Sequence, residues 1–176
     1  KPLVQTYPAG IVCTGAGYRV LLSSRLTSQG VVDLETPDQK RITSTPLGIG
    51  FFDPVSGRSV LLAQIKDSRA EVSSNGIVFR DAFEGSGIEA AVTYRYEVGH
   101  FRQDVTFVTR PSVTPADFDM GEKTRLEVLT EILECPEPNM TLHFVRRETN
   151  ATARASMAEP DLADETIRFG DETFHF

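Results

Sequence analysis

Residues 90–110 read AAVTYRYEVGHFRQDVTFVTR, and this stretch decides the fold class. Apolar and polar side chains alternate on both sides of Gly99-His100, which is typical of strands that bury one face. Gly at the first central position of a two-residue turn supplies the positive φ of a type II′ hairpin. The stretch therefore predicts an antiparallel β-hairpin that turns at Gly99-His100.

Two patterns predict the register of this hairpin, because a register must match both apolar residues and opposite charges across the ladder. The pairs expected on the apolar face are Val98–Phe101, Tyr96–Gln103, Tyr94–Val105 and Val92–Phe107. The pairs expected on the other face are Glu97–Arg102, Arg95–Asp104 and Thr93–Thr106. We expect the face with Val92, Tyr94, Val105 and Phe107 to line the core, and Arg95 and Asp104 to face solvent.

Four further turns lie upstream and predict hairpins of the same kind. Asn75-Gly76 is a strong hairpin signal, and Asp53–Gly57 combines an early Pro with a closing Gly. The expected residue pairs are Val72–Phe79 and Glu71–Arg80 across Asn75-Gly76, and Glu35–Lys40 across Pro37-Asp38. The expected strand pairs are 47–52 with 59–65 across Asp53–Gly57, and 11–13 with 18–22 across Gly15-Ala16. We therefore predict an all-β, mainly antiparallel fold, a β-sandwich or a related multi-hairpin sheet.

The pattern loosens after residue 110. Residues 111–123 form a polar loop, and 124–134 fit either a helix, with a capping box at Thr124 and Glu127, or a strand. We expect a strand there and another over 140–146. Residues 150–164 indicate a short helix or a lid-like loop, and 166–169 and 172–176 indicate terminal strands. At most one or two short helices are expected, in the C-terminal third.

The 176 residues point to one domain over 1–176, since domains usually have about 100–200 residues. The chain begins at Lys1 rather than Met and ends inside a predicted strand, so we expect a fragment or module of a longer chain. The net charge is −7 and the 18 Lys and Arg are scattered, which argues against nucleic acid and against an anionic membrane surface. No apolar run suggests membrane insertion or a signal peptide.

Cys13 and Cys135 are far apart in the sequence. A disulfide between them would close a long loop and stabilise the fold by about 4–5 kcal/mol in the chain-entropy model. Two separate buried thiols are the alternative that we favour, because no spacing rule supports pairing.

The residues that carry catalysis or metal binding in other proteins form no recognised pattern here. His100, His143 and His175 lack metal-ligand spacing, Gly15-Ala16-Gly17 is not followed by a helix, and Gly85-Ser86-Gly87 lacks the context of a nucleophile elbow. Acidic residues cluster at Asp117, Asp119 and Glu122 and at Glu127, Glu131 and Glu134, as expected for a solvated face. We therefore assign no catalytic, cofactor-binding or metal-binding residue, and expect no cofactor.

The remaining polar and aromatic residues bear on two binding functions, Ca²⁺ binding and carbohydrate binding. Asp117 and Asp119 alternate as Ca²⁺ ligands do, but without an EF-hand glycine and glutamate pattern. Carbohydrate sites use exposed aromatic rings, and the chain has no Trp. Its four tyrosines are Tyr7, Tyr18, Tyr94 and Tyr96.

Three stretches carry a resemblance to known proteins: DPVSGRSVLLA at 53–63, QDV at 103–105 and TRLEVLTE at 124–131. They resemble β-rich segments of very large secreted or surface proteins of environmental bacteria, some of which carry YD-type (Rhs-like) repeats. The resemblance covers about half of the chain and has no catalytic motif. It implies an extracytoplasmic, structural or adhesive module and assigns no functional residue.

Two classes of function follow. The first is a non-enzymatic structural or interaction module of an extracellular or cell-surface bacterial protein, whose partners are flanking domains or further copies of itself. The alternative is a carbohydrate-binding or carbohydrate-active β-sandwich module. Exposed aromatic rings beside two carboxylates in one cleft would favour the alternative, and an apolar face or an open sheet edge would favour the first.

Overall fold

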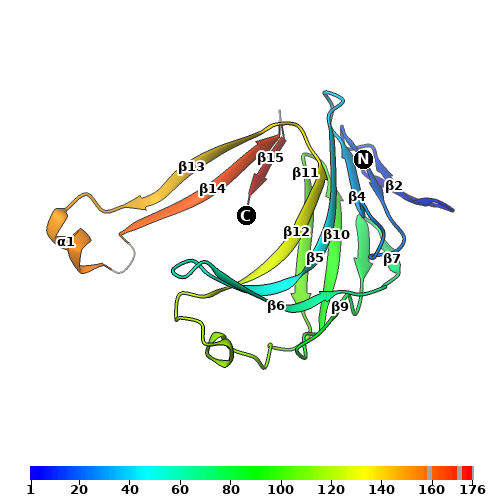
Figure 1. Cartoon of the computed structure of the whole chain (residues 1–176). Coiled ribbons are helices and arrows are strands. Elements are labelled where there is room, and N and C mark those ends of the chain that lie inside the picture. The colour runs from blue at the N-terminus through cyan, green and yellow to red at the C-terminus, as the bar shows by residue number, and fades with distance from the viewer. Residues whose placement is uncertain (158–159, 170–171, 176) are drawn as a thin grey trace. The chain divides into compact units, whose positions relative to one another are not determined.

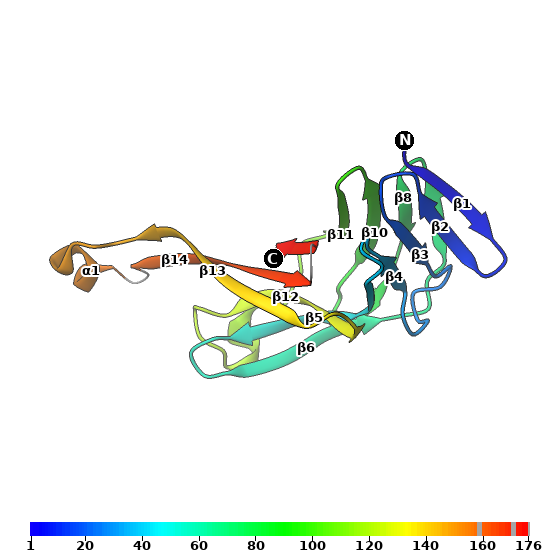
Figure 2. The same cartoon turned by 90° about the horizontal axis from the view of Figure 1, so that it is seen from above.

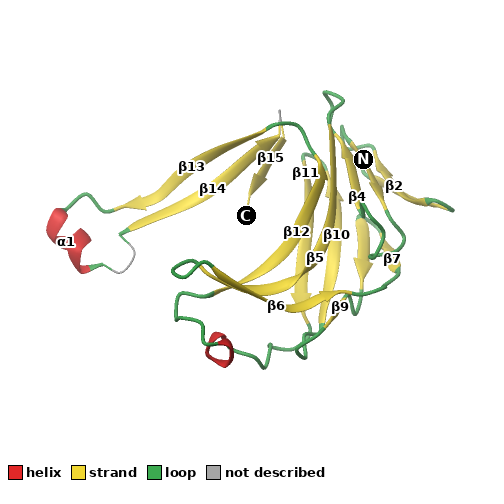
Figure 3. Cartoon of the chain, in the orientation of Figure 1, coloured by secondary structure: helices red, strands yellow, loops and turns green. Residues whose placement is uncertain are grey.

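The computed structural model describes residues 1–157, 160–169 and 172–175 and confirms an all-β fold. Strands make up 57% of it and helices 6%, and every strand pair is antiparallel (Figure 3). The chain divides into two compact units, Lys1–Glu134 and Cys135–Phe176. Each unit is described by itself, and the assignment of 1–176 to a single domain stays a prediction.

The first unit contains an eight-stranded sheet in the order β1-β2-β3-β4-β5-β6-β9, with β12 paired to β5 (Figure 1). Its strands are β1 (Leu3–Tyr7), β2 (Gly10–Thr14), β3 (Arg19–Leu22), β4 (Val32–Glu35), β5 (Arg41–Asp53), β6 (Arg58–Ile65), β9 (Phe83–Glu84) and β12 (Arg125–Glu134). The strand reading of 124–134 is thus confirmed. Strand β1, over residues 3–7, is not among the strands predicted from the sequence.

Strand β5 is the longest strand and pairs with three others, β4, β6 and β12. Strand β4 pairs with Arg41–Ser44, β6 pairs with Gly48–Asp53, and β12 pairs with Thr43–Phe52. A strand has only two sides, so β4 and β6 must share one side of β5 while β12 occupies the other. Pro46 lies between the residues that pair with β4 and those that pair with β6, where its missing N–H costs no ladder bond to either.

A four-stranded sheet in the order β11-β10-β8-β7 completes the first unit. Its strands are β7 (Ala70–Ser73), β8 (Gly76–Phe79), β10 (Ala90–Glu97) and β11 (His100–Phe107). The side chains of Phe79, Val92, Tyr94 and Tyr96 are buried, as are those of Cys13, Val20 and Leu22 on the larger sheet. The Tyr96 hydroxyl bonds to the main chain of Tyr18 and Ala16, which joins the two sheets at one end of the core.

The hairpin at 90–110 is present, but its predicted register is wrong. Val98 and Gly99 form the turn, Gly99 has φ 83°, and Tyr96 lies opposite Phe101 rather than Gln103. Each residue of β11 therefore faces a partner two positions earlier than predicted. An even shift leaves the apolar and polar faces unchanged. The ion pairs also survive, as diagonal contacts: Arg95–Asp104 at 3.5 Å and Arg102–Glu97 at 3.3 Å.

The core face of this hairpin is confirmed for β10 and only in part for β11. Val92 and Tyr94 are buried, whereas Val105 and Phe107 are half-buried because β11 is the edge of its sheet. Asp104 and Arg95 lie on the outer face, with side chains 41% and 49% exposed.

The registers predicted across Asn75-Gly76 and Pro37-Asp38 are also wrong. Ser74 and Asn75 form the first turn, so Val72 faces Ile77 rather than Phe79, while Glu71 and Arg80 still meet at 2.8 Å on the diagonal. Gly76 lies in β8 opposite Arg95, where a methyl group would overlap the carbonyl oxygen of Tyr94. This Gly is needed for the close approach of two backbones and not for a turn.

The turn at Pro37-Asp38 is one residue longer than predicted. Gln39 adopts a left-handed conformation with φ 63°, and Glu35 faces Arg41 rather than Lys40. The Thr36 main chain and hydroxyl both bond to the main chain of Lys40, which closes the loop.

The turn at Asp53–Gly57 is confirmed, and the hairpin predicted across Gly15-Ala16 is present with a longer loop, residues 15–18. Asp53 ends β5 opposite Arg58, and its carboxylate accepts hydrogen bonds from the N–H of Val55 at 2.9 Å and the hydroxyl of Ser56 at 2.7 Å. These bonds, with that of Ser56 the largest cause, lower the pKa of Asp53. Gly57 has φ 70° and closes the turn. Strands β2 and β3 pair as Cys13–Val20 and Ile11–Leu22.

The second unit is a three-stranded sheet in the order β13-β14-β15. Its elements are β13 (Pro138–Arg147), α1 (Ala151–Ser156), β14 (Asp161–Phe169) and β15 (Glu172–His175). The expected strands are present, and of the two alternatives for 150–164 a short helix is observed, although β14 already begins at Asp161, before the predicted 166–169. Asn150 caps α1 by accepting hydrogen bonds from the N–H groups of Thr152 and Ala153. The end of the predicted last strand, Phe176, lies outside the described residues.

Candidate association surfaces

The histidines and acids form no metal-binding cluster in the part of the chain that the structure describes. No group of three His, Cys, Asp or Glu residues there is placed to hold a metal ion. His100 is exposed and pairs with Glu97, and His143 is exposed on β13. His175 lies in β15, and its side chain is outside the description.

The two cysteines are separate free thiols, as we favoured, but only Cys13 is buried and Cys135 is exposed. Burial raises the pKa of Cys13 to about 11, so that thiol is protonated at neutral pH. A protonated thiol inside a core is a poor nucleophile, because the thiolate is the reactive form. Cys13 is therefore a packing residue.

The Asp117–Asp119 segment is a small structural element. The short 3-10 helix η1 (Pro115–Phe118) begins with Thr114, whose N–H and hydroxyl donate to the Asp117 carboxylate at 2.7 and 2.8 Å. These bonds lower the pKa of Asp117. The Arg58 guanidinium donates to the main-chain oxygens of Phe118 and Asp119. The Asp117 carboxylate thus caps this helix, and the segment is tied down by protein groups.

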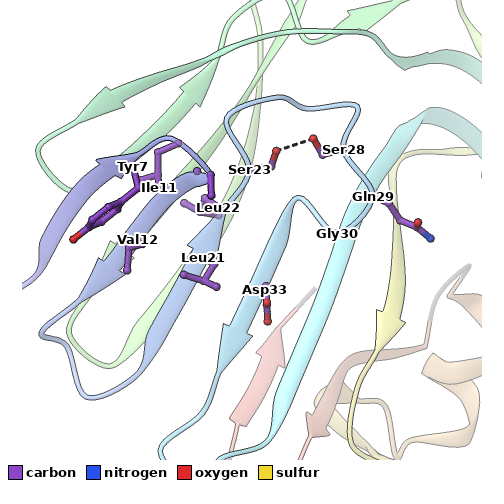
Figure 4. Close-up of a pocket in the computed structure, with 12 residues that line it drawn as sticks. Tyr7, Ile11, Val12, Leu21, Leu22, Ser23, Ser28, Gln29, Gly30 and Asp33 are labelled. Carbon is purple, nitrogen blue, oxygen red and sulfur yellow. Dashed lines mark hydrogen bonds between the residues drawn. The ribbon is translucent and has the colours of Figure 1, made fainter.

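A pocket of about 370 Å³ lies over β2 and β3 (Figure 4). Tyr7 stands at its edge, and Ser23 and Ser28 bond to each other at 2.8 Å. The one acid that lines it, Asp33, already accepts hydrogen bonds from Arg41, from Nε at 2.7 Å and from Nη2 at 2.6 Å. The pocket therefore offers one exposed aromatic ring and one carboxylate that is paired with Arg41. A cleft that hydrolyses carbohydrate needs two carboxylates.

The other tyrosines are engaged inside the fold. Tyr94 and Tyr96 are buried, and burial raises the pKa of both. Tyr18 packs against Tyr96 with ring centroids 4.7 Å apart, and its hydroxyl donates to the carbonyl oxygens of Glu97 and His100. A platform of exposed aromatic rings is thus not built from these residues.

Strand β12 carries an unusual amount of exposed apolar surface. Its large apolar side chains are all 38–42% exposed: Leu126, Val128, Leu129, Ile132 and Leu133. Its main chain pairs with β5 along one side only, and no described strand pairs with the other. One side-chain bond, from Gln103 on β11 to Thr130 at 3.0 Å, reaches this strand. The alternation of residues 126–132 predicts a strand, but the sequence does not reveal that both faces of this strand stay exposed.

Strand β13 of the second unit shows the same property. All ten of its residues are exposed, and its large apolar side chains are 50–68% exposed: Met140, Leu142, Phe144 and Val145. The strands β12 and β13 together hold nine of the seventeen large apolar side chains that are exposed in the described part of the chain. Contiguous exposed apolar residues of this kind mark interaction surfaces more often than scattered ones do.

Comparison with known proteins adds no assignment: neither a protein-family model, nor a curated protein, nor a solved structure matches this chain. Among the described residues, no helix has the length and apolar character needed to cross a membrane. The site must therefore be judged from its own geometry, and the best-developed features are the apolar strands and the open sheet edges.

Proposed function

We propose that this chain is a non-enzymatic structural or interaction module that works by associating with other protein surfaces. The observation that carries the proposal is β12, a ten-residue strand with five exposed large apolar side chains and one unpaired side. Burying apolar surface is favourable by about 25 cal/mol per Å², so a partner that covers this strand would gain stability. The resemblance to β-rich segments of secreted bacterial proteins supports an extracellular or cell-surface setting.

The charges on β12 suit a surface that recognises protein. Glu127 and Glu131 alternate with Leu129 and Leu133, and Glu134 lies 3.6 Å from Arg41. Charged residues on an open strand oppose edge-to-edge pairing, so we expect association to use the exposed apolar side chains of β12 rather than its unpaired backbone. The alternative has less support, because the pocket at Tyr7 offers a single aromatic ring for carbohydrate binding and a single carboxylate where glycoside hydrolysis needs two.

The test is a double variant in which Leu126→Glu and Ile132→Glu add charge at the two most exposed apolar positions of β12. Leu61→Glu is the matched control, because Leu61 is a large apolar residue that is 55% exposed on a different strand, β6. We expect the parent chain and the control to associate with rising concentration in sedimentation velocity, and the double variant to lose most of that association.

Far-UV circular dichroism and urea unfolding would show that the double variant keeps its fold. If glutamate at these positions prevents folding, threonine at both positions reduces the apolar area without adding charge. Association of a folded double variant at the level of the parent would contradict the proposal, as would a parent chain that stays monomeric at every concentration.

A further inference from the structure

Strand β1 is an open sheet edge without the usual protection. Its sequence, Leu3-Val4-Gln5-Thr6-Tyr7, contains no charged residue and no proline. It pairs with β2 on one side and ends the eight-stranded sheet, as Figure 2 shows at the outer margin of that sheet. The backbone N–H and C=O groups on its free side are a template for another extended strand.

The other edges among the described strands carry charges or are very short. Charged or proline residues on edge strands discourage pairing with other chains. Strand β9 has two residues and pairs only with Gln64 and Ile65 of β6, so the rest of β6 is also an edge, and it carries Arg58. The other charged edge residues are Glu71 on β7, Arg102 and Asp104 on β11, Glu127 and Glu131 on β12, Arg146 and Arg147 on β13 and Glu172 on β15. In this set β1 alone contains neither a charged residue nor a proline, and the flanking Pro2 and Pro8 confine any pairing to the five residues Leu3–Tyr7.

The two faces of β1 are distinguished by its register with β2. Val4 and Thr6 pair with the buried Cys13 and Ile11, so they share the face that leads to the core, although Val4 is only half-buried and Thr6, near the end of the strand, is exposed. Leu3, Gln5 and Tyr7 lie on the other face, where Leu3 and Tyr7 are both 49% exposed. The exposed side chains of Leu3 and Tyr7 thus lie on either side of the uncharged Gln5 side chain.

This arrangement is complementary to itself. If two copies of β1 run antiparallel about a two-fold axis at Gln5, each Leu3 faces a Tyr7 and each Val4 faces a Thr6. Apolar and aromatic side chains directly opposite one another stabilise a strand pair, and no like charges meet. The contact closes on itself, as two-fold interfaces do, and joins the sheets of two copies into one.

We propose that β1 pairs with β1 of a second copy of this chain in this register. The inference rests on the proposed function, because it names a partner for an association module. Five residue pairs bury less surface than a standard interface of about 1,600 Å², so the pairing is weak and depends on concentration. It uses a surface other than β12, and the two can be tested separately.

The experiment starts from the Leu126→Glu, Ile132→Glu double variant, in which association through β12 is removed. We expect a dimer to remain at high concentration in sedimentation velocity. Adding Gln5→Lys or Gln5→Glu should abolish that dimer, because like charges would meet at the two-fold axis. An equimolar mixture of the two should restore it. Ser59→Lys is the control, since Ser59 is exposed on β6, and four strands separate β6 from β1 in the sheet order.

A disulfide readout tests the register itself. In a chain with Cys135→Ser, Gln5→Cys should form a covalent dimer on mild oxidation, because directly opposed Cα atoms are about 4.5–5.5 Å apart. Tyr7→Cys, equally accessible but opposite Leu3, should form much less.

The two proposals fail in different ways. A double variant that is monomeric while the parent associates, or Gln5 variants that dimerise like their parent, would overturn the β1 pairing and leave β12 as the association surface. Equal disulfide trapping at positions 5 and 7 would overturn the register. Association that ignores the β12 changes but disappears with Gln5→Lys would support β1 and contradict the proposed role of β12.

Discussion

The hydroxyl of Tyr96 should stabilise the first unit more than that of Tyr94, although both rings are buried. The Tyr96 hydroxyl donates to the carbonyl oxygen of Tyr18 and accepts a hydrogen bond from the N–H of Ala16 at 3.1 Å. Both partners belong to the loop between β2 and β3, so these two bonds join one sheet to the other. Tyr96→Phe removes both bonds and leaves two backbone groups without that partner.

The expected cost of Tyr96→Phe follows from the surroundings of those groups. A buried polar group left without a partner costs about 1–3 kcal/mol. Ala16 and Tyr18 are half-buried, so water reaches them in part and each cost falls at the low end of that range. We therefore expect Tyr96→Phe to lower the free energy of unfolding by about 2–3 kcal/mol.

Tyr94→Phe is the matched control. The Tyr94 hydroxyl donates to the Gln103 side chain at 2.9 Å, and Gln103 lies on an edge strand where its amide can turn to solvent. The expected loss is about 0.5–1.5 kcal/mol, the net value of one ordinary hydrogen bond. Urea unfolding followed by circular dichroism would measure both variants. A Tyr96→Phe variant that loses no more stability than Tyr94→Phe would refute the reasoning.

Two further predictions concern backbone packing and pH. Gly76→Ala should destabilise by about 3 kcal/mol or more, because its methyl group would overlap the Tyr94 carbonyl, whereas Gly99→Ala has open space and should cost about 1–2 kcal/mol for its positive φ. Equal urea midpoints for these two variants would show that β8 can move away from the Tyr94 carbonyl at little cost, and would contradict this prediction. Burial raises the pKa of Cys13 from 9.0 to about 11, so the folded state holds this proton more tightly than the unfolded chain does. The stability due to that difference is complete below pH 9.0 and is lost as pH rises toward 11, and the loss should be smaller in Cys13→Ala, as pH-dependent urea unfolding would reveal.

The candidate surfaces were only partly accessible to sequence reasoning. The alternation of 126–132 favoured a strand, but its partner, β5, lies some eighty residues upstream, and local pattern carries no information on such a pairing. The exposure of β12 follows from that pairing and from the absence of a described strand on its other side. Strand β1 had no turn signal strong enough to mark it, because Pro8-Ala9 is a weaker hairpin signal than Asn-Gly or Asp-Gly.

The sequence by itself determined the all-β class, most of the strands and the apolar face of the hairpins at 70–79 and 90–107. It also determined the local turn at Asp53–Gly57, whose hydrogen bonds are made by residues within five positions of one another. Such features depend on side-chain alternation and local bonding, which a sequence displays directly.

Only the tertiary structure decided the registers of the hairpins at 70–79 and 90–107. Registers two residues apart bury the same faces and keep the charge pairs within reach, directly or on the diagonal, so local pattern cannot choose between them. The choice depends on contacts between segments distant in sequence. Gly76 lies where β8 meets the Tyr94 carbonyl, and Tyr96 lies where its hydroxyl meets the loop at Tyr18.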